Sequence, residues 1–437
     1  MNDLLKRAKH LRSAWWLAVL LLLSGCAQVS TKRINSSPER GASASALNFA
    51  APLRVSAADA DAAEPALASG RDGTAFIVWV EHTDTDADVF LARLTAAVEP
   101  AGAAVRVNSK PGVATAWRGD QPTIAVAPDG TVYVGWTGRQ TSGSGHAAGI
   151  GHASDLYLSA SRDGGKSFDA PVKVNDDKQP AVHGMHSLAV DADGRIHLAW
   201  LDERNIMQPH ESMKAEGHHM ESNREVYATF STDGGRTFAA NKQVATNACP
   251  CCKTALAVAS DGRVYLSWRQ VLPGDFRHIT VSSSADQGKT FSPGVVVSDD
   301  RWSLKGCPVS GASLFAGADG SLRVVWFSAG ERGEQGLYQA ESRDAGLTFS
   351  PRQLVAASST RGTPVLTAGT AIWEGEQNGQ PRVMSTQAVQ ISSPATPTIV
   401  GEGQLPAAAT SGERLLIAYV ANAGERRSVF VVAGKKS

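Results

Sequence analysis

The sequence has no excess of charge, few cysteines and only one long hydrophobic run. Lys and Arg together number 42, and so do Asp and Glu, which gives no electrostatic basis for binding nucleic acid. Five cysteines occur in 437 residues. After Leu23 no second long apolar run follows, so the remainder is expected to be soluble. We therefore expect no nucleic-acid partner. The fold is indicated by turn motifs and repeats.

The first 26 residues predict a lipoprotein signal peptide. Basic residues precede a short apolar run, Trp15 to Leu23, which is short for a membrane-spanning helix. The run ends in Leu23-Ser-Gly-Cys26, which resembles a bacterial lipobox, where the cysteine is lipidated; an ordinary signal peptide is the alternative. We expect a lipid at Cys26, a flexible tether over residues 27–50 and a place in the cell envelope. In a Gram-negative cell, Ala27 after the cysteine would indicate the outer membrane, facing the periplasm or the cell surface.

A short motif of the form Ser-x-Asp-x-Gly-x-Thr/Ser-Phe occurs four times. The copies span residues 161–168, 231–238, 284–291 and 342–349. Each copy lies between two β-rich runs, which is typical of a hairpin turn. Its Asp can accept hydrogen bonds from turn amides, its Gly tolerates positive φ, and its Phe can pack below the turn. The structural aspartates of these turns are Asp163, Asp233, Asp286 and Asp344.

A second repeat runs in step with the first. An Asp-Gly pair is followed at constant spacing by a tryptophan, as in Asp129-Gly130 and Trp136. The other tryptophans at this position are Trp79, Trp200, Trp268 and Trp326. The repeating unit is therefore four strands joined by an Asp-Gly turn, a loop and the eight-residue motif. Its recurrence at about 45–70 residues is typical of a propeller blade.

The eight-residue motif resembles the Asp box, or BNR repeat, of the sialidase/neuraminidase superfamily and its propeller relatives. The resemblance covers the chain from about residue 50 to the end. It implies an all-β propeller of four-stranded antiparallel blades over residues 51–437. Asp boxes are structural turns, so the resemblance is specific for the fold and weak for an activity.

We expect seven blades, with six, the number in sialidases, as the alternative. Residues 363–400 match the repeat poorly, which leaves the count open. The run Ala51 to Val55 resembles an outer strand at Ala170 to Val174, so the N-terminal strand should complete the last blade and close the ring. The inner strands should begin near Pro65, Pro122, His186, Lys253, Pro308, Pro364 and Pro406.

Strand alternation places the Asp-Gly turns and the Asp boxes on one face. The second turn of each blade and the connections between blades share the other face. That face should carry sulfur and imidazole side chains, from the blade connections and from the long loop at residues 201–223. The candidate metal ligands on it are Cys249, Cys251, Cys252, Cys307, His183, Met185, His186, His210, His218 and His219.

Three interpretations of the cysteines remain open. Export and the even number of cysteines after Cys26 favour disulfides between blade connections. Thiolates with imidazole and thioether would suit a soft ion such as copper(I), or zinc without Met. In that case one or two thiolates would join His183 or His186 while the other cysteines pair. The spacing of Cys249 and Cys252 also allows a redox pair, although no thioredoxin-like pattern surrounds it.

The resemblance also implies an enzyme alternative. Sialidases bind the sialic acid carboxylate with three arginines and use a Tyr/Glu pair as nucleophile with an Asp as acid/base, unlike the usual two-carboxylate glycosidase. The candidate residues are Arg118, Asp120, Asp202, Glu203, Arg204, Arg269, Arg361 and Glu374. The Arg-Ile-Pro segment that usually supplies the first arginine is absent, however, and no Tyr is placed at the mouth. The opposing interpretation is that these charges line a solvated face.

The sequence therefore predicts a lipid-anchored envelope propeller that binds a ligand or a soft metal, copper or zinc, through its Cys, His and Met side chains. A sialidase-like exo-glycosidase is the first alternative. A scaffold for an envelope protein partner, or a glycan-binding module, uses the same face.

Overall fold

The computed structural model describes residues 48–140, 153–206, 223–304, 306–359, 362–388 and 397–435. The chain divides into Met1–Ala44 and a compact unit, Ser45–Ser437, to which all described residues belong. Within the described ranges every regular element is a β-strand, as expected for an all-β fold. No helix in these ranges is long and apolar enough to cross a bilayer.

The strands form antiparallel sheets in which neighbours in sequence are neighbours in space. One sheet holds β2 (Asp61–Ser69), β3 (Ala75–His82), β4 (Ala87–Leu94) and β5 (Val105–Arg106). The next holds β6 (Thr123–Val126), β7 (Val132–Arg139), β8 (Ser154–Ser161) and β9 (Val172–Lys173). Alternating side chains and short turns allow each run of four strands to fold as a local meander.

The middle of the chain forms one eight-stranded sheet made of two such meanders. The first contains β10 (His183–Val190), β11 (Ile196–Asp202), β12 (Arg224–Ser231) and β13 (Lys242–Ala248). The second contains β14 (Ala255–Val258), β15 (Val264–Leu272), β16 (Phe276–Ser284) and β17 (Val295–Val296). A single pairing, Ala248 with Gln270, links β13 to β15 and joins the two meanders.

Three further sheets complete the unit. The first holds β18 (Ala312–Ala316), β19 (Leu322–Ser328), β20 (Gly336–Ser342) and β21 (Gln353–Ala357) in that order. The second holds β22 (Val365–Thr367), β23 (Thr370–Gln377), β24 (Gln380–Gln387) and β25 (Thr398–Glu402). The last holds β26 (Gln404–Ser411), β27 (Arg414–Ala423), β28 (Arg426–Lys435) and the N-terminal β1 (Leu53–Arg54). The register of β1 with β28 pairs Leu53 with Val431, so the two ends of the unit share a sheet.

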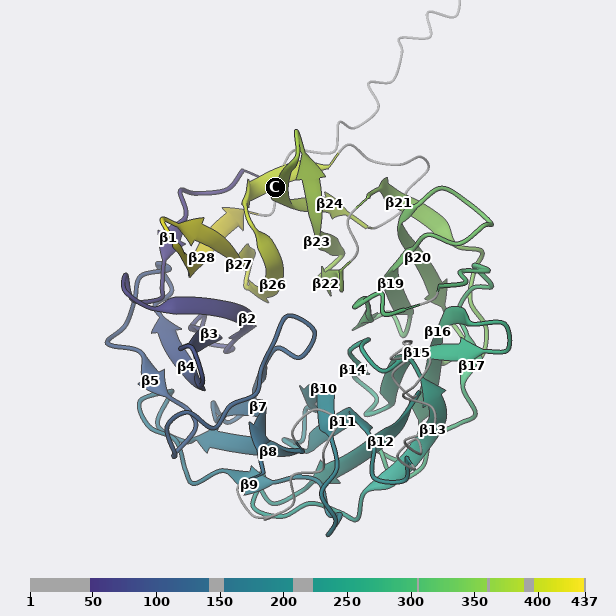
Figure 1. The fold of residues 1–437 in the computed structure, drawn as a ribbon, viewed down its shortest axis with the longest axis horizontal. Coiled ribbons are helices and arrows are strands. Elements are labelled where there is room, and N and C mark those ends of the chain that lie inside the picture. The colour runs from purple at the N-terminus through teal and green to yellow at the C-terminus, as the bar shows by residue number, and fades with distance from the viewer. Residues whose placement is uncertain are drawn as a thin grey trace, which may run out of the picture. The chain divides into compact units, whose positions relative to one another are not determined.

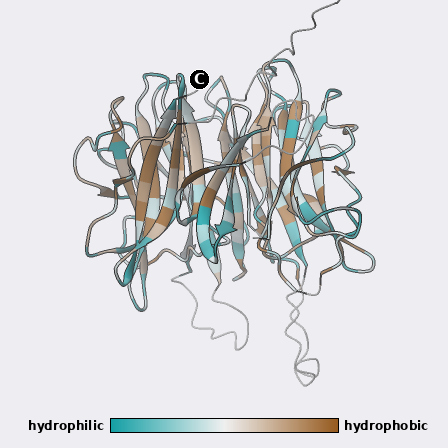
Figure 2. Ribbon diagram, turned by 90° about the horizontal axis from the view of Figure 1, so that it is seen from above, coloured by the Kyte–Doolittle hydropathy of each residue, from teal (hydrophilic) through white to brown (hydrophobic). Residues whose placement is uncertain are grey.

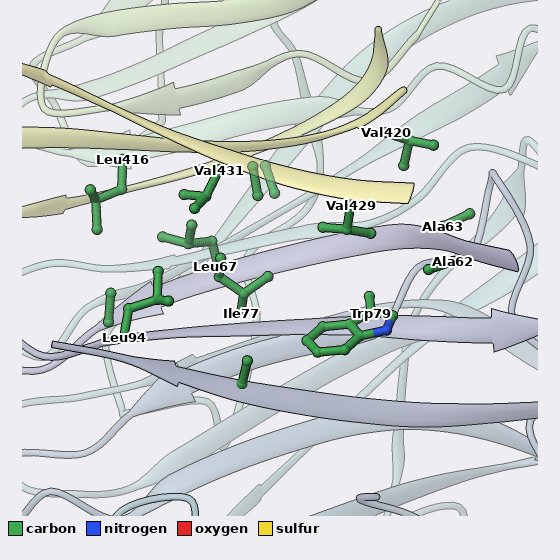
Figure 3. Close-up of a cluster of buried hydrophobic side chains, with 14 residues drawn as sticks. Ala62, Ala63, Leu67, Ile77, Trp79, Leu94, Leu416, Val420, Val429 and Val431 are labelled. Carbon is green, nitrogen blue, oxygen red and sulfur yellow. The ribbon is translucent and has the colours of Figure 1, made fainter. Parts of the chain in front are cut away.

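The sheets stand around a common centre, with β2, β10, β14, β22 and β26 innermost (Figure 1). Hydrophobic clusters lie between successive sheets, and the one between β2–β4 and β26–β28 contains Trp79 and Val431 (Figure 3). Seen from the side, hydrophobic stretches run along the strands and hydrophilic residues occupy many of the loops (Figure 2). Burial of these facing surfaces, at about 25 cal/mol per Å², is the main stabilising contribution to such packing.

Each Asp box is held by hydrogen bonds within its own eight residues. Asp163 accepts from the Ser161 hydroxyl at 2.8 Å and from the backbone amide of Ser167 at 3.0 Å. The Ser167 hydroxyl also donates to it at 2.6 Å. The hydrogen bonds from Ser167 and Ser161 hold the pKa of Asp163 well below its ordinary value. Asp233, Asp286 and Asp344 have the corresponding serine and threonine partners.

Antiparallel order sorts the turns into two sets. The first and third turns of each meander, which include the Asp boxes, lie at one end of the strands, called here the box end. The second turns and the connections between successive meanders lie at the other, the connection end. The candidate site is built at the connection end.

Candidate functional site

The sulfur-bearing segment follows β13, where the two meanders of the eight-stranded sheet meet. The amide of Cys249 donates to the carbonyl of Arg269 on β15 at 2.8 Å, one residue beyond the pairing of Ala248. A turn then brings the amide of Cys252 to 3.4 Å from the carbonyl of Cys249. The turn therefore points cysteine side chains into the packing between β10–β13 and β14–β17.

Four cysteines form what we call the sulfur cluster: Cys249, Cys251, Cys252 and Cys307. Cys251 and Cys307 form a disulfide, whereas Cys249 and Cys252 are thiols. The Sγ atom of Cys249 lies 3.4 Å from that of Cys252 and 3.9 Å from that of Cys251. Ligand atoms of Cys249, Cys251 and Cys252 all fall within 4.8 Å of one another. Disulfide and thiol pair thus coexist in one cluster.

The environment of the cluster is apolar but carries positive charge. Cys249, Cys251 and Cys252 are at most 3% exposed and pack with Met185 and Trp268. Into this setting Arg277 donates from Nη1 to the Sγ of Cys249 at 3.2 Å. A buried cation beside one thiol distinguishes that sulfur from its neighbours.

The two thiols consequently differ in acidity. The hydrogen bond from Cys252, aided by the charges of Arg277 and Arg269 and opposed by burial, lowers the pKa of Cys249 to about 6. Burial, together with the neighbouring Cys249, raises the pKa of Cys252 well above its ordinary value. The arrangement therefore favours a thiolate at Cys249 hydrogen-bonded by a thiol at Cys252.

Arg269 forms buried hydrogen bonds with the backbone near the sulfur cluster. Its side chain is fully buried, at 0% exposure, and donates to the carbonyls of Ser310, Arg277 and Phe327 at 2.8, 3.1 and 3.1 Å. Its guanidinium also lies over the ring of Trp302 at 4.8 Å. These contacts occupy the cation with the protein's own backbone, so Arg269 is not presented to a ligand.

A tight turn before β6 reaches toward the centre of the unit (Figure 1). In this axial turn, residues 117–120, the amide of Asp120 donates to the carbonyl of Trp117 at 2.8 Å. Arg118 donates from Nη2 to both oxygens of Glu374 on β23, at 2.9 and 3.0 Å, and from Nη1 to Gln404 at 3.3 Å. Trp117 is 43% exposed, while every other described tryptophan is at most 3% exposed.

The last residue of the axial turn, Asp120, is a buried carboxylate. Asp120 accepts from the amide of Met185 at 2.6 Å, from the Thr137 hydroxyl at 2.9 Å and from His186 Nδ1 at 3.2 Å. Burial opposes the charged form, but His186 and Lys253 outweigh it and lower the pKa of Asp120. The three donors therefore keep Asp120 ionised and fix it as a support for the turn.

Lys253, the residue after Cys252, extends toward the same turn. Its Nζ donates to the carbonyl of Gln121 at 2.6 Å. Burial lowers the pKa of Lys253 to about 8, although Asp120 acts in the opposite direction. A lysine with a lowered pKa, an exposed indole and a carboxylate-paired arginine thus gather at the connection end.

His183 belongs to a separate charge cluster. Its Nε2 lies 3.1 Å from Asp177 and 3.4 Å from Asp202, and its Nδ1 donates to the Ser154 carbonyl at 2.6 Å. Burial acts against the charged imidazole, but Asp177 and Asp202 prevail and raise the pKa of His183. Arg204 closes the cluster by donating to Asp202 at 2.9 Å and to Asp176 at 2.6 Å.

The structure separates residues that the sequence grouped on one face. Arg118, Asp120 and Glu374 lie together, whereas Asp202 and Arg204 are engaged with His183. Glu203 pairs with Arg224 at 2.6 Å. The described candidate arginines therefore do not converge as a three-arginine carboxylate clamp. Cys26, His210, His218, His219 and Arg361 lie outside the described residues.

One sequence-based expectation needs correction. His183, Met185 and His186 were placed in the connection that leads into an inner strand beginning near His186, but β10 already begins at His183 and all three residues are buried. A β-bulge between Gly184 and Ser187, with Met185 at a φ of 54°, extends the strand to include them. The same bulge turns the two imidazoles toward carboxylates.

Three residues that the sequence did not indicate as site residues contribute to the sulfur cluster and to the axial turn. Arg277 gave no signal, because it lies inside a strand and meets Cys249 only in the fold. Trp117 did give one, since it stands outside the repeated Trp position and so had no assigned place in a blade. Lys253 was treated only as the start of an inner strand. All six tyrosines lie in strands, and burial raises the pKa of each.

Comparison with known families now places this architecture. A family model described as "BNR repeat-like domain" matches residues 113–363, more than half of the chain. The chain belongs to the BNR repeat-like domain family. This membership agrees with the four Asp boxes and confirms the family resemblance inferred from them. No curated protein matches the sequence.

Solved structures show the same fold at low identity. A protein of unknown function from Dyadobacter fermentans is 14% identical, with a TM-score of 0.53 over 89% of this chain and 99% of that one. The polysaccharide lyase Uly1 is 12% identical, with a TM-score of 0.51 over 89% and 92%. An ulvan lyase bound to a sugar is 10% identical, with a TM-score of 0.51 over 90% and 95%. At such identities the likeness describes the fold of this BNR-repeat protein alone.

Proposed function

We propose that this BNR-repeat protein binds copper(I) through the thiol pair of Cys249 and Cys252. The observation that carries the proposal is the placement of two buried thiols, 3.4 Å apart, in one cluster. Thiolates are the ligands that select soft metal ions. An apolar surrounding excludes water and the harder oxygen ligands that would favour magnesium or calcium.

The charges around the pair favour copper(I) over zinc. Two thiolates with one copper(I) give a complex of net charge −1, and Arg277, 3.2 Å from the Cys249 sulfur, complements that charge. Zinc in a structural site takes four ligands. The remaining two sulfurs of the cluster are bonded to each other, so two thiolates leave a zinc ion short of ligands.

The disulfide changes which cysteines a metal would use. Cys251 and Cys307 stand at the connection end as candidates by sequence, but their sulfurs are paired in the structure. His183 and His186 contact Asp177 and Asp120, respectively. The proposal therefore rests on Cys249 and Cys252 alone, with Cys251 and Cys307 as the matched control pair.

The test is a competitive copper(I) titration without oxygen, using a chromophoric copper(I) chelator. Wild-type protein should withdraw about one copper(I) per chain from the chelator, and Cys249→Ser and Cys252→Ser should each lose it. The variant Cys251→Ser/Cys307→Ser should keep binding, because it leaves the thiol pair in place. Equal binding by wild type and Cys249→Ser, in folded proteins, contradicts the proposal.

A second candidate function is glycan binding at the axial turn. The observation that favours it is the exposed Trp117 next to Arg118, whose side chain is 39% exposed, since an indole face can stack on a sugar while a guanidinium binds its carboxylate. Trp117→Ala should then abolish binding of acidic oligosaccharides, with Trp268→Phe as a fold control.

We expect no cleavage of a fluorogenic sialoside. Cleavage that is lost in Arg118→Ala would instead favour the sialidase alternative.

We further propose that the unit is a closed seven-bladed propeller held in the cell envelope by a lipid on Cys26. Seven hydrophobic clusters of described residues, each shared by two adjacent meanders, support the blade number, and the pairing of β1 with β28 supports closure. The lipobox-like segment supports the anchor. Cys26→Ala should move the protein from the detergent phase to the aqueous phase, and unchanged partitioning would refute the lipid.

A further inference from the structure

The Cys251–Cys307 disulfide connects the interior of the sulfur cluster to the surface. Cys251 is 3% exposed, whereas Cys307 belongs to the exposed residues. The interior end of this bond lies 3.9 Å from the Sγ atom of Cys249. A thiol in reach of one sulfur and solvent in reach of the other are the two conditions for exchange across a disulfide.

We propose that the sulfur cluster is a thiol–disulfide relay, in which the disulfide moves between Cys251–Cys307 and Cys249–Cys252. This activity does not depend on copper, and nothing in the family's fold requires it. The substrate class is a thiol or disulfide that meets Cys307 at the surface. The buried thiol pair then stores or releases two electrons through internal exchange.

The positions of the sulfurs assign the order of steps. Cys249 is the first nucleophile, because Arg277 donates to its sulfur at 3.2 Å and stabilises negative charge there. Cys252 is the resolving thiol, because its sulfur already lies 3.4 Å from that of Cys249. Cys307 is the first leaving group, and its exposure lets solvent protonate it.

Bonds and protons balance in both steps. First, the Cys249 thiolate attacks the Cys251 sulfur, so that a Cys249–Cys251 bond forms, the Cys251–Cys307 bond breaks and Cys307 leaves as a thiolate. Second, Cys252 loses its proton to solvent through the released thiolate and attacks Cys249, and Cys251 leaves and is protonated. The number of disulfides stays at one throughout, so no oxidant or reductant is consumed.

The relay would also control the proposed metal site, and this part rests on the proposed function. With the disulfide at Cys251–Cys307, both copper(I) ligands are thiols. With the disulfide at Cys249–Cys252, both ligands are consumed. Copper(I) should therefore hold the disulfide at the surface pair, and a bound ion should block exchange.

The experiment labels metal-free full-length protein in its native state with a bulky maleimide. Samples taken over time are acidified, unfolded and alkylated, and peptide mass spectrometry assigns the label and the disulfide. In wild type, Cys307 should become labelled while a Cys249–Cys252 disulfide accumulates. In Cys249→Ser, labelling of Cys307 should slow at least about tenfold, because the first nucleophile is gone.

Two variants separate exchange from general opening of the fold. Cys252→Ser should still release Cys307 but accumulate a Cys249–Cys251 disulfide, since the resolving thiol is missing. Arg277→Gln should slow labelling about tenfold, as loss of a charge-assisted hydrogen bond to the nucleophile predicts. If Cys249→Ser does not fold, the wild-type disulfide map alone decides.

The relay is overturned if only Cys251–Cys307 is recovered from wild type while Cys307 is labelled no faster than in Cys249→Ser. In that case the disulfide is a structural staple beside inert thiols. Failure of the copper titration leaves this result unaffected. Exchange without copper binding would therefore refute the proposed function and keep the relay.

Discussion

The two ends of the strands hold their turns by different means. At the box end, Asp163 and its counterparts bond within eight residues of sequence. At the connection end, Arg118 reaches Glu374 across 256 residues, and Cys251 bonds to Cys307 across 56. Local, repeated contacts keep a fold the same from blade to blade. Long-range contacts that occur once bring unlike chemical groups together, and here they gather thiols, cations and an exposed indole.

If the connection end depends on interior contacts that occur only once, removing one of them should lower the free energy of unfolding more than a change at the box end. Arg269→Ala deletes three hydrogen bonds to buried carbonyls and leaves a cavity. We expect a loss of about 4 kcal/mol in the free energy of unfolding, measured by urea denaturation. Arg263→Ala at the box end, where the side chain meets solvent, should change it by less than about 0.5 kcal/mol. Equal effects of the two variants would erase the contrast between the ends.

A pH titration sharpens the comparison through His183. Asp177 and Asp202 raise the folded-state pKa of this imidazole against the effect of burial. A raised pKa stabilises the fold fully below the unfolded value of about 6.5, and this contribution is lost as pH rises through the folded pKa. The difference in unfolding free energy between wild type and His183→Gln should therefore shrink as pH rises above about 6.5. A difference that grows with pH would contradict the assigned charge cluster.

The smallest effect belongs to the box end. The residue after the box aspartate has positive φ in all four copies; it is Gly164 and Gly234 in two of them, and Gln287 and Ala345 in the others. Ala345→Gly removes the strain of an Ala at a φ of 62° and should stabilise the protein by about 0.5 kcal/mol. Thermal unfolding measures the shift, with Gly234→Ala as the opposite change. Destabilisation by Ala345→Gly would show that the turn tolerates a side chain without strain.

The same contrast explains how far the sequence could predict the structure. The box end could be predicted because its partners lie within a few residues, so Ser161, Asp163 and Ser167 already appear together in one motif. The strands followed from alternation and from the Trp repeat, and β1 was expected beside the last strands. The sequence could not decide whether Cys249, Cys251 or Cys252 forms a disulfide with Cys307. Only the fold places Cys251 against Cys307 and Arg277 against Cys249.

The candidate site was located in part for the same reason. The Cys-Pro-Cys-Cys segment is visible as a motif, but its imidazole partners were inferred from a shared face, which is too coarse to decide contact. The bulge at Met185 that takes His183 and His186 into β10 depends on one residue with positive φ. The same irregularity recurs with Glu64 in β2 and Leu405 in β26, both at positive φ, but the three residues differ in type, so no sequence motif marks the bulge.

Copper K-edge X-ray absorption of the copper(I)-loaded protein tests the central claim most directly. The account predicts a first shell of two sulfur atoms, from Cys249 and Cys252, with no nitrogen or oxygen scatterers. The spectrum should be the same for Cys251→Ser/Cys307→Ser, which retains the thiol pair. A first shell dominated by nitrogen or oxygen, or a spectrum unchanged in Cys249→Ser, would place copper elsewhere and contradict the thiolate site.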